Sequence, residues 1–408
     1  MFRGTSGRVL FLAILTSALT GPGQTIGVSV FIDHFVADLG LSRSAVSAAY
    51  MVGTLTGALV LPMVGSFVDR RGVRLAQMIV GSLFVLALVN MSFVNGLVWL
   101  AVGFTGIRLL GQGSLSLIST VTVSIWFRER RGTAIGVFSV FSNALMVLTP
   151  VILAVVIRAV GWRNTWLIAA AAIGLTVVPI AKWGLRPLPA KRAENAAIDA
   201  STTVKAEPFD GSYTRGEAMH TVGFWILVAV AGSAGMMSTA LNFHQIDLLG
   251  NAGLSSTAAA AMFAPQVLGS SLAGIAFGWV ADRMNARFLP TASMVLLITA
   301  HLLASVVSPG AAVVAYAIAL GAAGGAVRTV TAALLPAWFG TAHLGAISGS
   351  LTLFNVGASA LGPVALALTQ AWFGSYPPAV LLLALLPGAA LLFSLGPTGV
   401  QPLEERIG

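Results

Sequence analysis

Long apolar runs, separated by short polar breaks, make up nearly the whole chain. A helix needs about 20 mostly apolar residues to cross the hydrocarbon core of a bilayer. Twelve segments meet this requirement, near residues 8–32, 44–66, 75–94, 97–125, 132–158, 162–185, 219–246, 256–280, 288–307, 311–337, 345–370 and 376–396. The pattern predicts an all-α membrane protein with twelve transmembrane helices.

One polar break is much longer than the others. It covers residues 186–217, between the sixth and seventh predicted helices, and holds prolines and charges of both signs. It has too few apolar residues to build a core of its own. We therefore expect an N-terminal six-helix bundle (1–185), a cytoplasmic linker (186–217) and a C-terminal six-helix bundle (218–408).

Polar and glycine markers recur in the second half of the chain at one fixed offset. Asp69-Arg70 returns 213 residues later as Asp282-Arg283, and Gly40-Leu41-Ser42 returns as Gly253-Leu254-Ser255. The chain is therefore built from two copies of one unit, which predicts two pseudo-symmetric bundles. Hydrophobic chains made of two parallel repeats are typical of secondary transporters, whose substrate sites lie near the membrane midplane.

Composition supports a lipid environment and argues against catalysis. The residues are 57% hydrophobic and 9% charged, whereas soluble domains carry about 25% charged residues. There is no cysteine, and the sequence shows neither a nucleotide-binding loop nor a catalytic or metal-ligand motif. We expect no enzyme activity, no cofactor and no metal.

The first apolar stretch is long enough to span the membrane, so we interpret it as a helix rather than a cleavable signal.

The basic residues gather on one side of the predicted topology. Of the 22 Lys and Arg residues, seventeen fall at the termini or in alternate loops, which places those regions in the cytoplasm. This sorting explains the net charge of +9 without a nucleic-acid partner. It predicts a multi-pass membrane protein with both termini cytoplasmic.

Two loops carry a family resemblance. Gly65-Ser66-Phe67-Val68-Asp69-Arg70-Arg71-Gly72-Val73-Arg74 and its second copy, Gly278 to Arg287, resemble the signature loop between helices two and three of the major facilitator superfamily. The resemblance implies a monomer that moves a small-molecule substrate by alternating access. A carboxylate at the end of helix two could accept hydrogen bonds from a neighbouring helix and pair with arginine, holding the halves closed on the cytoplasmic side. The alternative is that these charges only set topology. The predicted gating residues in these loops are Asp69, Arg70, Arg74, Asp282, Arg283 and Arg287.

Further motifs are similar to the bacterial branch related to monocarboxylate and oxalate carriers, which implies a location in the inner membrane of a bacterial cell. They are Gly223-Phe224-Trp225, His244, Gly253-Leu254-Ser255 and Gly161-Trp162-Arg163. The chain departs from that branch in helix eight, where the resemblance implies a carboxylate-binding arginine and this sequence has Gly274. The helix-five pattern of drug–proton antiporters is missing as well, since Thr149-Pro150 is followed by Val151 and Ile152.

Two arginines lie near the middle of predicted spans. Arg108 and Arg328 are each about ten residues from a helix end. An arginine at that depth costs about 2.5–3.5 kcal/mol to insert, so it usually faces a water-filled cavity or a partner. In the family's fold, helices four and ten line the central cavity. We expect Arg328 to bind an anionic or carbonyl-bearing group; the alternative is an arginine bound to backbone carbonyls at a helix packing defect. Arg108 could equally be structural.

Other polar residues at mid-depth complete the predicted substrate site. Each could instead join two helices, through a hydrogen bond worth about 0.6 kcal/mol on average. Gln112 shares a helix face with Arg108, and His244 could titrate near neutral pH. The predicted contacts, besides the two arginines, are Gln112, His244, Gln24, Asn143, Gln266 and Asn355.

Two acidic residues occupy nearly equivalent positions in the repeats. Asp33 ends helix one and Asp247 ends helix seven. They could be solvated at the outer surface or paired at the helix ends, or they could form a proton-linked outer gate.

These features predict uptake of a small organic anion such as a carboxylate, with protons as the candidate coupling ion. The alternatives are a carrier of a larger, weakly charged metabolite or vitamin, and efflux of a metabolite or drug.

Overall fold

A computed structural model describes residues 4–127, 131–185, 212–283, 288–340 and 344–400. Within these ranges every regular element is a helix. The chain divides into two compact units, unit 1 (Met1–Val204) and unit 2 (Lys205–Gly408), and each is described by itself.

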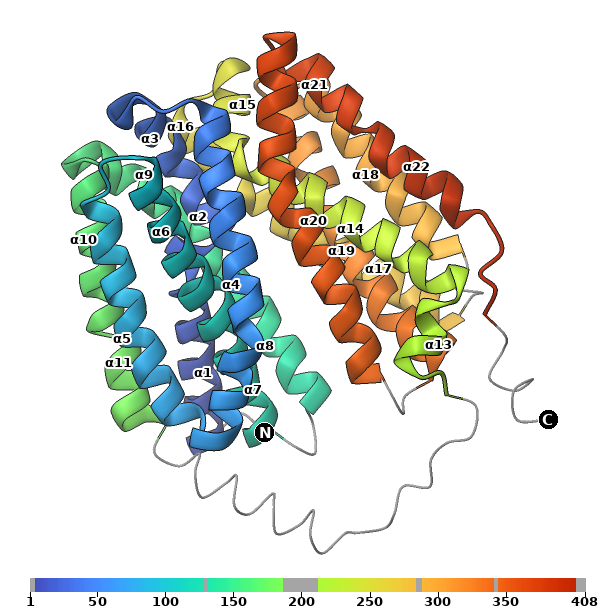
Figure 1. The fold of residues 1–408 in the computed structure, drawn as a ribbon, viewed down its shortest axis with the longest axis horizontal. Helices are drawn as coiled ribbons and strands as arrows, with labels where there is room; N and C mark the ends of the chain where they lie inside the picture. Colours follow the sequence, from blue (N-terminus) through green and yellow to red (C-terminus); the bar gives the residue numbers. More distant parts are fainter. Residues whose placement is uncertain (1–3, 128–130, 186–211, 284–287, 341–343, 401–408) are drawn as a thin grey trace, which may run out of the picture. The chain divides into compact units, whose positions relative to one another are not determined.

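Unit 1 runs from blue to green in Figure 1. Its helices are α1 (Gly4–Ala18), η1 (Gly21–Gly23), α2 (Thr25–Val28), η2 (Ser29–Phe31), α3 (Ile32–Leu39), α4 (Arg43–Arg71), α5 (Val73–Ser92), α6 (Leu97–Ile107), η3 (Arg108–Leu115), α7 (Ser116–Trp126), α8 (Arg131–Met146), α9 (Leu148–Val160), α10 (Trp162–Gly174), α11 (Val177–Pro179) and η4 (Ile180–Gly184).

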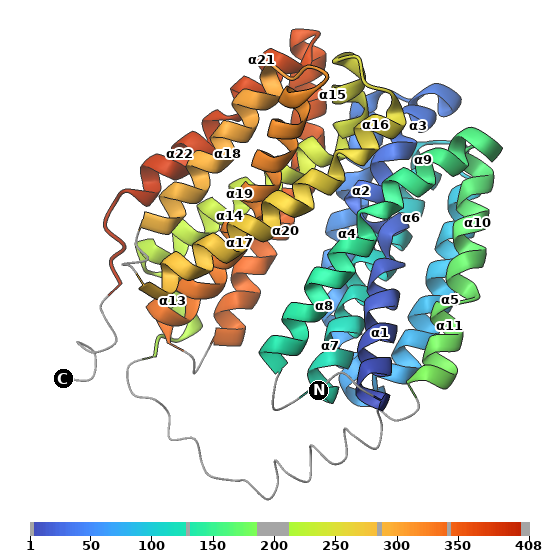
Figure 2. The ribbon, with the colours of Figure 1, turned by 180° about the vertical axis from the view of Figure 1, so that it is seen from behind.

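Unit 2 runs from yellow-green to red and is also seen from behind in Figure 2. Its helices are α13 (Arg215–Met219), α14 (Val222–Phe243), α15 (Gln245–Asn251), α16 (Ser256–Ala261), α17 (Phe263–Arg283), α18 (Leu289–Ser305), α19 (Ala311–Phe339), α20 (Leu344–Phe373), α21 (Tyr376–Leu383) and α22 (Leu385–Ser394).

Each of the twelve predicted spans coincides with a helix or with a run of consecutive helices. Among the described residues, nine helices are long and apolar enough to cross a membrane, and a bent pair, Gly4–Gly23 with Thr25–Leu39, makes a tenth. The other two predicted spans are 97–125, where η3 interrupts the α-helix, and 288–307, which contains α18 with 17 residues.

Local structure repeats along with the sequence. Gly40 and Gly253 both end a helical turn with positive φ, at 64° and 94°, a conformation that glycine adopts without steric cost. Two residues later Ser42 and Ser255 cap the next helices, accepting hydrogen bonds from the backbone N–H of Ala45 and Ala258 at 3.1 and 3.3 Å. The Gly-Leu-Ser motif is therefore a helix stop followed by an N-cap.

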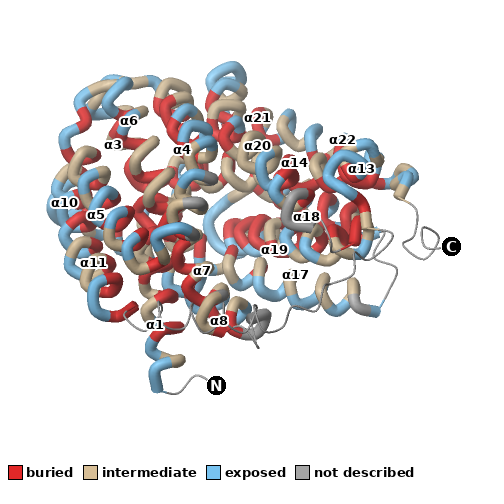
Figure 3. Tube along the Cα trace, turned by 60° about the horizontal axis from the view of Figure 1, so that its bottom comes forward, coloured by how far each residue is buried: buried red, intermediate tan, exposed pale blue. Residues whose placement is uncertain are grey.

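Buried residues run as stripes along the helices, as the red segments in Figure 3 show. The faces between these stripes are apolar as well. Leu59, Ile275 and Trp372 are 74%, 73% and 79% exposed, which is expected when lipid rather than water surrounds the helices.

Glycines let α17 and α19 pack with their backbones almost touching. A Cβ atom on Gly321 would lie 1.8 Å from the carbonyl oxygen of Gln266, and one on Gly325 would lie 2.1 Å from that of Ser270. Small residues at such crossings are how membrane helices gain van der Waals contact.

The described end of the expected linker belongs to unit 2. Tyr213 is buried, and its N–H donates to the carbonyl of Phe339 at 3.0 Å. Thr214 and Glu217 form a capping box that begins α13. Residues 212–217 are therefore part of the packed unit, which corrects the expectation that the linker extends to 217. Residues 186–211 lie outside the described part of the chain.

Candidate functional site

The first span is broken in its middle. Gly21-Pro22-Gly23 forms a short 3-10 turn, Gln24 is extended at φ −82° and ψ 157°, and the helix then resumes at Thr25. The two halves meet at 44°. Broken helices are tolerated at membrane depth where their freed backbone groups are buried in protein or line a cavity, and transporters often bind substrates at such breaks.

The fourth span is distorted beside this break. Residues Arg108–Leu115 form the π-helix η3, a type of distortion that occurs often at functional sites. A Cβ atom on Gly23 would meet the carbonyl oxygen of Ile107 at 2.5 Å and the Cα of Gly111 at 3.3 Å. The glycines therefore allow the broken segment to lie directly against η3.

Arg108 joins the two irregular segments to α4. Its Nε donates to the hydroxyl of Thr54 at 3.0 Å, and its Nη1 donates to the hydroxyl of Thr25 at 3.3 Å and the carbonyl of Gly23 at 3.5 Å. The guanidinium lies 4.6 Å from the centre of the Tyr50 ring, within range of a cation–π interaction. All these acceptors are uncharged, and Nη2 takes part in none of these hydrogen bonds.

Two glutamines extend this polar cluster. The side chain of Gln24 donates to the hydroxyls of Thr20 and Ser116 at 2.9 and 3.4 Å. The Oε1 atom of Gln112, four residues after Arg108 in η3, is buried and accepts no hydrogen bond from any described residue. A buried acceptor without a partner costs about 1–3 kcal/mol, so Gln112 is ready to accept a hydrogen bond from a ligand.

Arg328 in α19 has a different environment. Its side chain is exposed on unit 2, and its one hydrogen bond to a described residue runs from Nη2 to the hydroxyl of Ser270 in α17. Thr331, which the sequence places close by, donates instead to the carbonyls of Val327 and Arg328 in its own helix. The guanidinium of Arg328 thus keeps most of its donors available.

Two of the predicted substrate-binding residues, His244 and Gln266, form hydrogen bonds to other helices of unit 2. His244 is fully buried, and its Nε2 lies 2.9 Å from the carbonyl oxygen of Pro363 in α20. Gln266 is also buried and donates to Gln245 at 2.5 Å, which in turn donates to the carbonyl of Ala259 at 2.9 Å. Both residues therefore join helices, which was the alternative given for each.

The two predicted asparagines differ in their surroundings. Asn143 lies on an exposed part of α8. Asn355 in α20 is half-buried against α14, where its Oδ1 lies 2.1 Å from the position that a Cβ on Gly235 would take. Asn143 therefore remains open to a ligand, while Asn355 fills the space beside a glycine.

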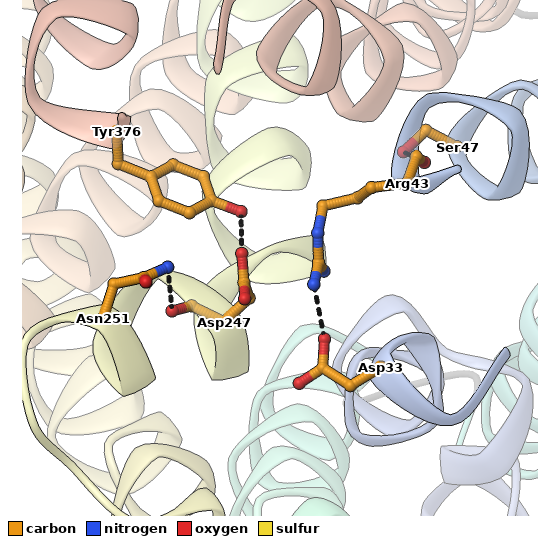
Figure 4. A network of polar contacts seen from close by, with 6 residues as sticks. All are labelled: Asp33, Arg43, Ser47, Asp247, Asn251 and Tyr376. Atoms are coloured by element: carbon orange, nitrogen blue, oxygen red, sulfur yellow. Dashed lines mark hydrogen bonds and ion pairs between the residues drawn. The ribbon is translucent and has the colours of Figure 1, made fainter. Parts of the chain in front are cut away.

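The two predicted outer-gate residues, Asp33 and Asp247, are each paired with a side chain of their own unit (Figure 4). Asp33 forms an ion pair with Arg43 at 2.7 Å, and Asp247 accepts a hydrogen bond from the hydroxyl of Tyr376 at 2.5 Å. Each carboxylate is thus held by a side chain of its own unit.

The predicted gating loops are described only in part. Arg74 donates to the carbonyls of Ala181 and Lys182 at 3.3 and 2.9 Å, so its guanidinium caps the end of η4 in the same unit. Arg70 and Arg283 are exposed, and the guanidinium of Arg283 lies 4.7 Å from the centre of the Trp279 ring. The side chains of Asp69 and Asp282, and the whole of Arg287, lie outside the described residues.

Comparison with known proteins settles the family. The model of the Major Facilitator Superfamily matches residues 10–310. The chain belongs to this superfamily. The superfamily and the all-α membrane fold predicted from the sequence are confirmed, and both point to a membrane transporter rather than an enzyme. The narrower resemblance to monocarboxylate and oxalate carriers stays a prediction.

Individual relatives are distant from this superfamily member. The uncharacterized MFS-type transporter YcxA of Bacillus subtilis (strain 168) is 24% identical over 266 residues, which cover 62% of this chain and 59% of that protein. The match therefore spans less than two thirds of that relative.

Solved structures share the fold along nearly the whole chain. A bacterial homologue of the human lysosomal transporter Spinster, inward-facing and occupied, has a TM-score of 0.73 and 17% identity over 96% of this chain and 97% of its own. A mutant of the nucleoside transporter NupG has a TM-score of 0.72 and 13% identity over 96% and 99%.

Sequence reasoning missed several residues of the Arg108 cluster in this superfamily member. Thr25, Tyr50 and Thr54 supply its hydroxyls and its ring, and a hydrogen bond of 2.7 Å joins the hydroxyls of Thr25 and Tyr50. The Gly21-Pro22-Gly23 sequence was the available signal, because it marks a break that brings polar backbone and side-chain groups to mid-span.

Proposed function

We propose that this superfamily member is a secondary transporter that moves a small organic anion, such as a carboxylate, by alternating access. The observation that carries the proposal is the exposed guanidinium of Arg328, which has a single neutral hydroxyl partner among the described residues. A cation at mid-span needs a partner, and a carboxylate matches the planar donor pattern of arginine.

Arg108 and Gln112 support the same proposal from unit 1. The guanidinium of Arg108 is also surrounded by neutral acceptors, so unit 1 adds a second uncompensated positive charge. The free acceptor on Gln112 suits a substrate hydroxyl or N–H group. We assign Arg328 to binding the carboxylate, and Arg108 to holding the broken first span in place.

We propose uptake into a bacterial cell across the inner membrane by a monomer whose termini are both cytoplasmic, with protons as the coupling ion. An imposed pH gradient across proteoliposomes tests the coupling. Uptake that does not respond to the gradient would contradict proton coupling, but it would not contradict transport of an organic anion.

Uptake by an Arg328 variant tests the anion directly. We expect Arg328→Ala to lower carboxylate uptake in proteoliposomes at least tenfold. A hydrogen bond to a charged group contributes about 1.5–3 kcal/mol, and a tenfold change needs only about 1.4 kcal/mol. Arg328→Lys keeps the charge without the planar donors and should retain part of the activity.

Arg158→Ala is a matched control, since it also removes one positive charge, from the exposed end of α9. It should transport normally. Unchanged uptake by Arg328→Ala would contradict the proposal. If uncharged aromatic solutes raise the melting temperature and carboxylates do not, the substrate is a larger, weakly charged metabolite rather than an organic anion.

A further inference from the structure

A polar cavity lies in unit 2 beside Asp247, and Arg328 is not among its lining residues. Its volume is about 260 Å³, and it is formed by the ends of α15, α18 and α20 and the beginning of α21. Its other walls are small or apolar, and its polar side chains are Asn251, Ser305, Gln370, Ser375 and Tyr376.

The internal repeat supplies a counterpart of this cavity in unit 1. Gly161 and Gly374 correspond at the offset of 213 residues, and both have positive φ, at 81° and 71°. Ser92 and Ser305 correspond too, and each is the last residue of its helix. The same offset pairs the cavity residues Ser375, Tyr376, Asn251 and Val307 with Trp162, Arg163, Asp38 and Val94.

Unit 1 fills the equivalent place with two of its own side chains, which we call the Trp–Arg plug (Trp162 and Arg163). The indole of Trp162 packs edge-on against Phe35 with ring centres 5.2 Å apart, and its N–H donates to Asp38 at 2.5 Å. The guanidinium of Arg163 lies 4.2 Å from the centre of the Trp162 ring.

The acceptors for the plug's cation are backbone carbonyls. Nη1 of Arg163 donates to the carbonyls of Ser92 and Val94 at 2.7 and 2.8 Å. Unit 1 therefore binds the guanidinium of Arg163 through one aromatic face and two carbonyl oxygens. No carboxylate takes part in these contacts.

Unit 2 keeps the acceptors and lacks the plug. Ser375 has no ring, and the hydroxyl of Tyr376 is directed to Asp247 (Figure 4). The amide nitrogen of Asn251 donates to the backbone carbonyl of Asp247 at 3.0 Å, which leaves its Oδ1 as an acceptor. Among the described residues no donor reaches the carbonyls of Ser305 and Val307.

We propose that this cavity is a second ligand site, which takes a planar organic cation rich in N–H donors, namely an amidinium or guanidinium group carried on an aromatic ring. Such a ligand would replace both parts of the Trp–Arg plug: its ring would fill the space that Trp162 fills in unit 1, and its N–H groups would meet the free carbonyls. The site is independent of the proposed transport substrate.

Binding of benzamidinium to the purified full-length protein tests the proposal, with neutral benzamide as the matched control ligand. We expect saturable binding of benzamidinium by calorimetry and a rise in melting temperature of about 3 °C at ten times its Kd. Benzamide, which lacks the charge and has fewer donors, should bind at least tenfold more weakly.

Variants of the cavity walls locate the site. Ser375→Trp supplies the missing ring and should weaken benzamidinium binding at least tenfold, whereas Ser375→Ala should bind as the wild type does. Asn251→Asp places a carboxylate where Asp38 stands in unit 1 and should tighten binding about tenfold. Arg328→Ala should leave the affinity unchanged, which separates this site from the transport site.

The absence of saturable benzamidinium binding would overturn the proposal. An affinity that neither Ser375→Trp nor Asn251→Asp changes would overturn it as well. If Ser375→Trp fails to fold, Asn251→Asp decides, because aspartate and asparagine have nearly the same shape.

Discussion

The two arginines at mid-span differ in how their donors are satisfied. Arg108 is 6% exposed and binds groups from three segments: the break in the first span, α2 and α4. Arg328 is exposed and binds one hydroxyl. We therefore expect the first to contribute mainly to stability and the second mainly to substrate binding.

Thermal unfolding of Arg108→Ala should show the structural contribution. The substitution removes three hydrogen bonds, which at about 0.6 kcal/mol each amount to roughly 2 kcal/mol. For a unit of this size that corresponds to a fall in melting temperature of about 4–8 °C.

Arg328→Ala is the control, and its melting temperature without substrate should change by about 2 °C or less, because one exposed hydrogen bond is lost. Equal losses in the two variants would contradict the division of roles.

The sequence located both arginines but not their partners. Their depth follows from counting apolar residues. The partners of Arg108 depend on a bend and a π-helical turn that bring Thr25 and Thr54 to the same guanidinium. His244 shows the same limit, since its partner is a backbone carbonyl 119 residues away, and a carbonyl group leaves no mark in a sequence.

At the scale of elements, glycine determines which helices approach closely. The crossing of α17 and α19 depends on Gly321 and Gly325, whose missing side chains are replaced by the backbone of the opposite helix. Neither position requires unusual backbone angles, so close packing is the reason for glycine at both.

Gly321→Ala should destabilise unit 2. Its Cβ would lie 1.8 Å from the carbonyl oxygen of Gln266, so the helices must separate, at a cost of about 1–3 kcal/mol. Thermal unfolding of the purified protein measures the loss.

Gly357→Ala serves as the matched control, because no atom lies within 4 Å of the added Cβ in α20. Alanine has a higher helix propensity than glycine, so this variant should unfold with the same free energy as the wild type or with up to about 1 kcal/mol more. If the two variants unfold at the same temperature, the packing role of Gly321 is wrong.

The helices were largely predictable, and their distortions only partly so. Apolar length located all twelve spans, and Gly21-Pro22-Gly23 marks the break in the first one. Nothing comparable marks the π-helix at Arg108–Leu115, because a residue inserted into a helix leaves its apolar pattern almost unchanged. The end of the linker was placed too late because Tyr213 packs against Phe339, a contact across more than 120 residues.

For the whole molecule, the distribution of basic residues predicts which ends of the helices face outward. The chain contains no cysteine, so single cysteines can report the accessibility of each end. Asn95 and Ser308 are exposed and correspond across the repeat, both on the side with few basic residues, while Arg71 is exposed on the other side.

A membrane-impermeant maleimide applied to intact cells should label Asn95→Cys and Ser308→Cys, and should label Arg71→Cys only after the cells are opened. The physical reason is the retention of basic loops in the cytoplasm. Labelling of Arg71→Cys in intact cells would show that this end of unit 1 faces outward, which would contradict the proposed topology.

The division of the chain at Val204 also matters during synthesis. A ribosome adds about 5–20 residues per second, so the synthesis of unit 2 takes about 10–40 s after that of unit 1 is complete. Helix formation and collapse take microseconds. Unit 1 therefore has time to pack around Arg108 while unit 2 is still being made, and a variant that prevents unit 2 from folding should leave behind a folded, membrane-inserted first half for the cell's quality-control proteases.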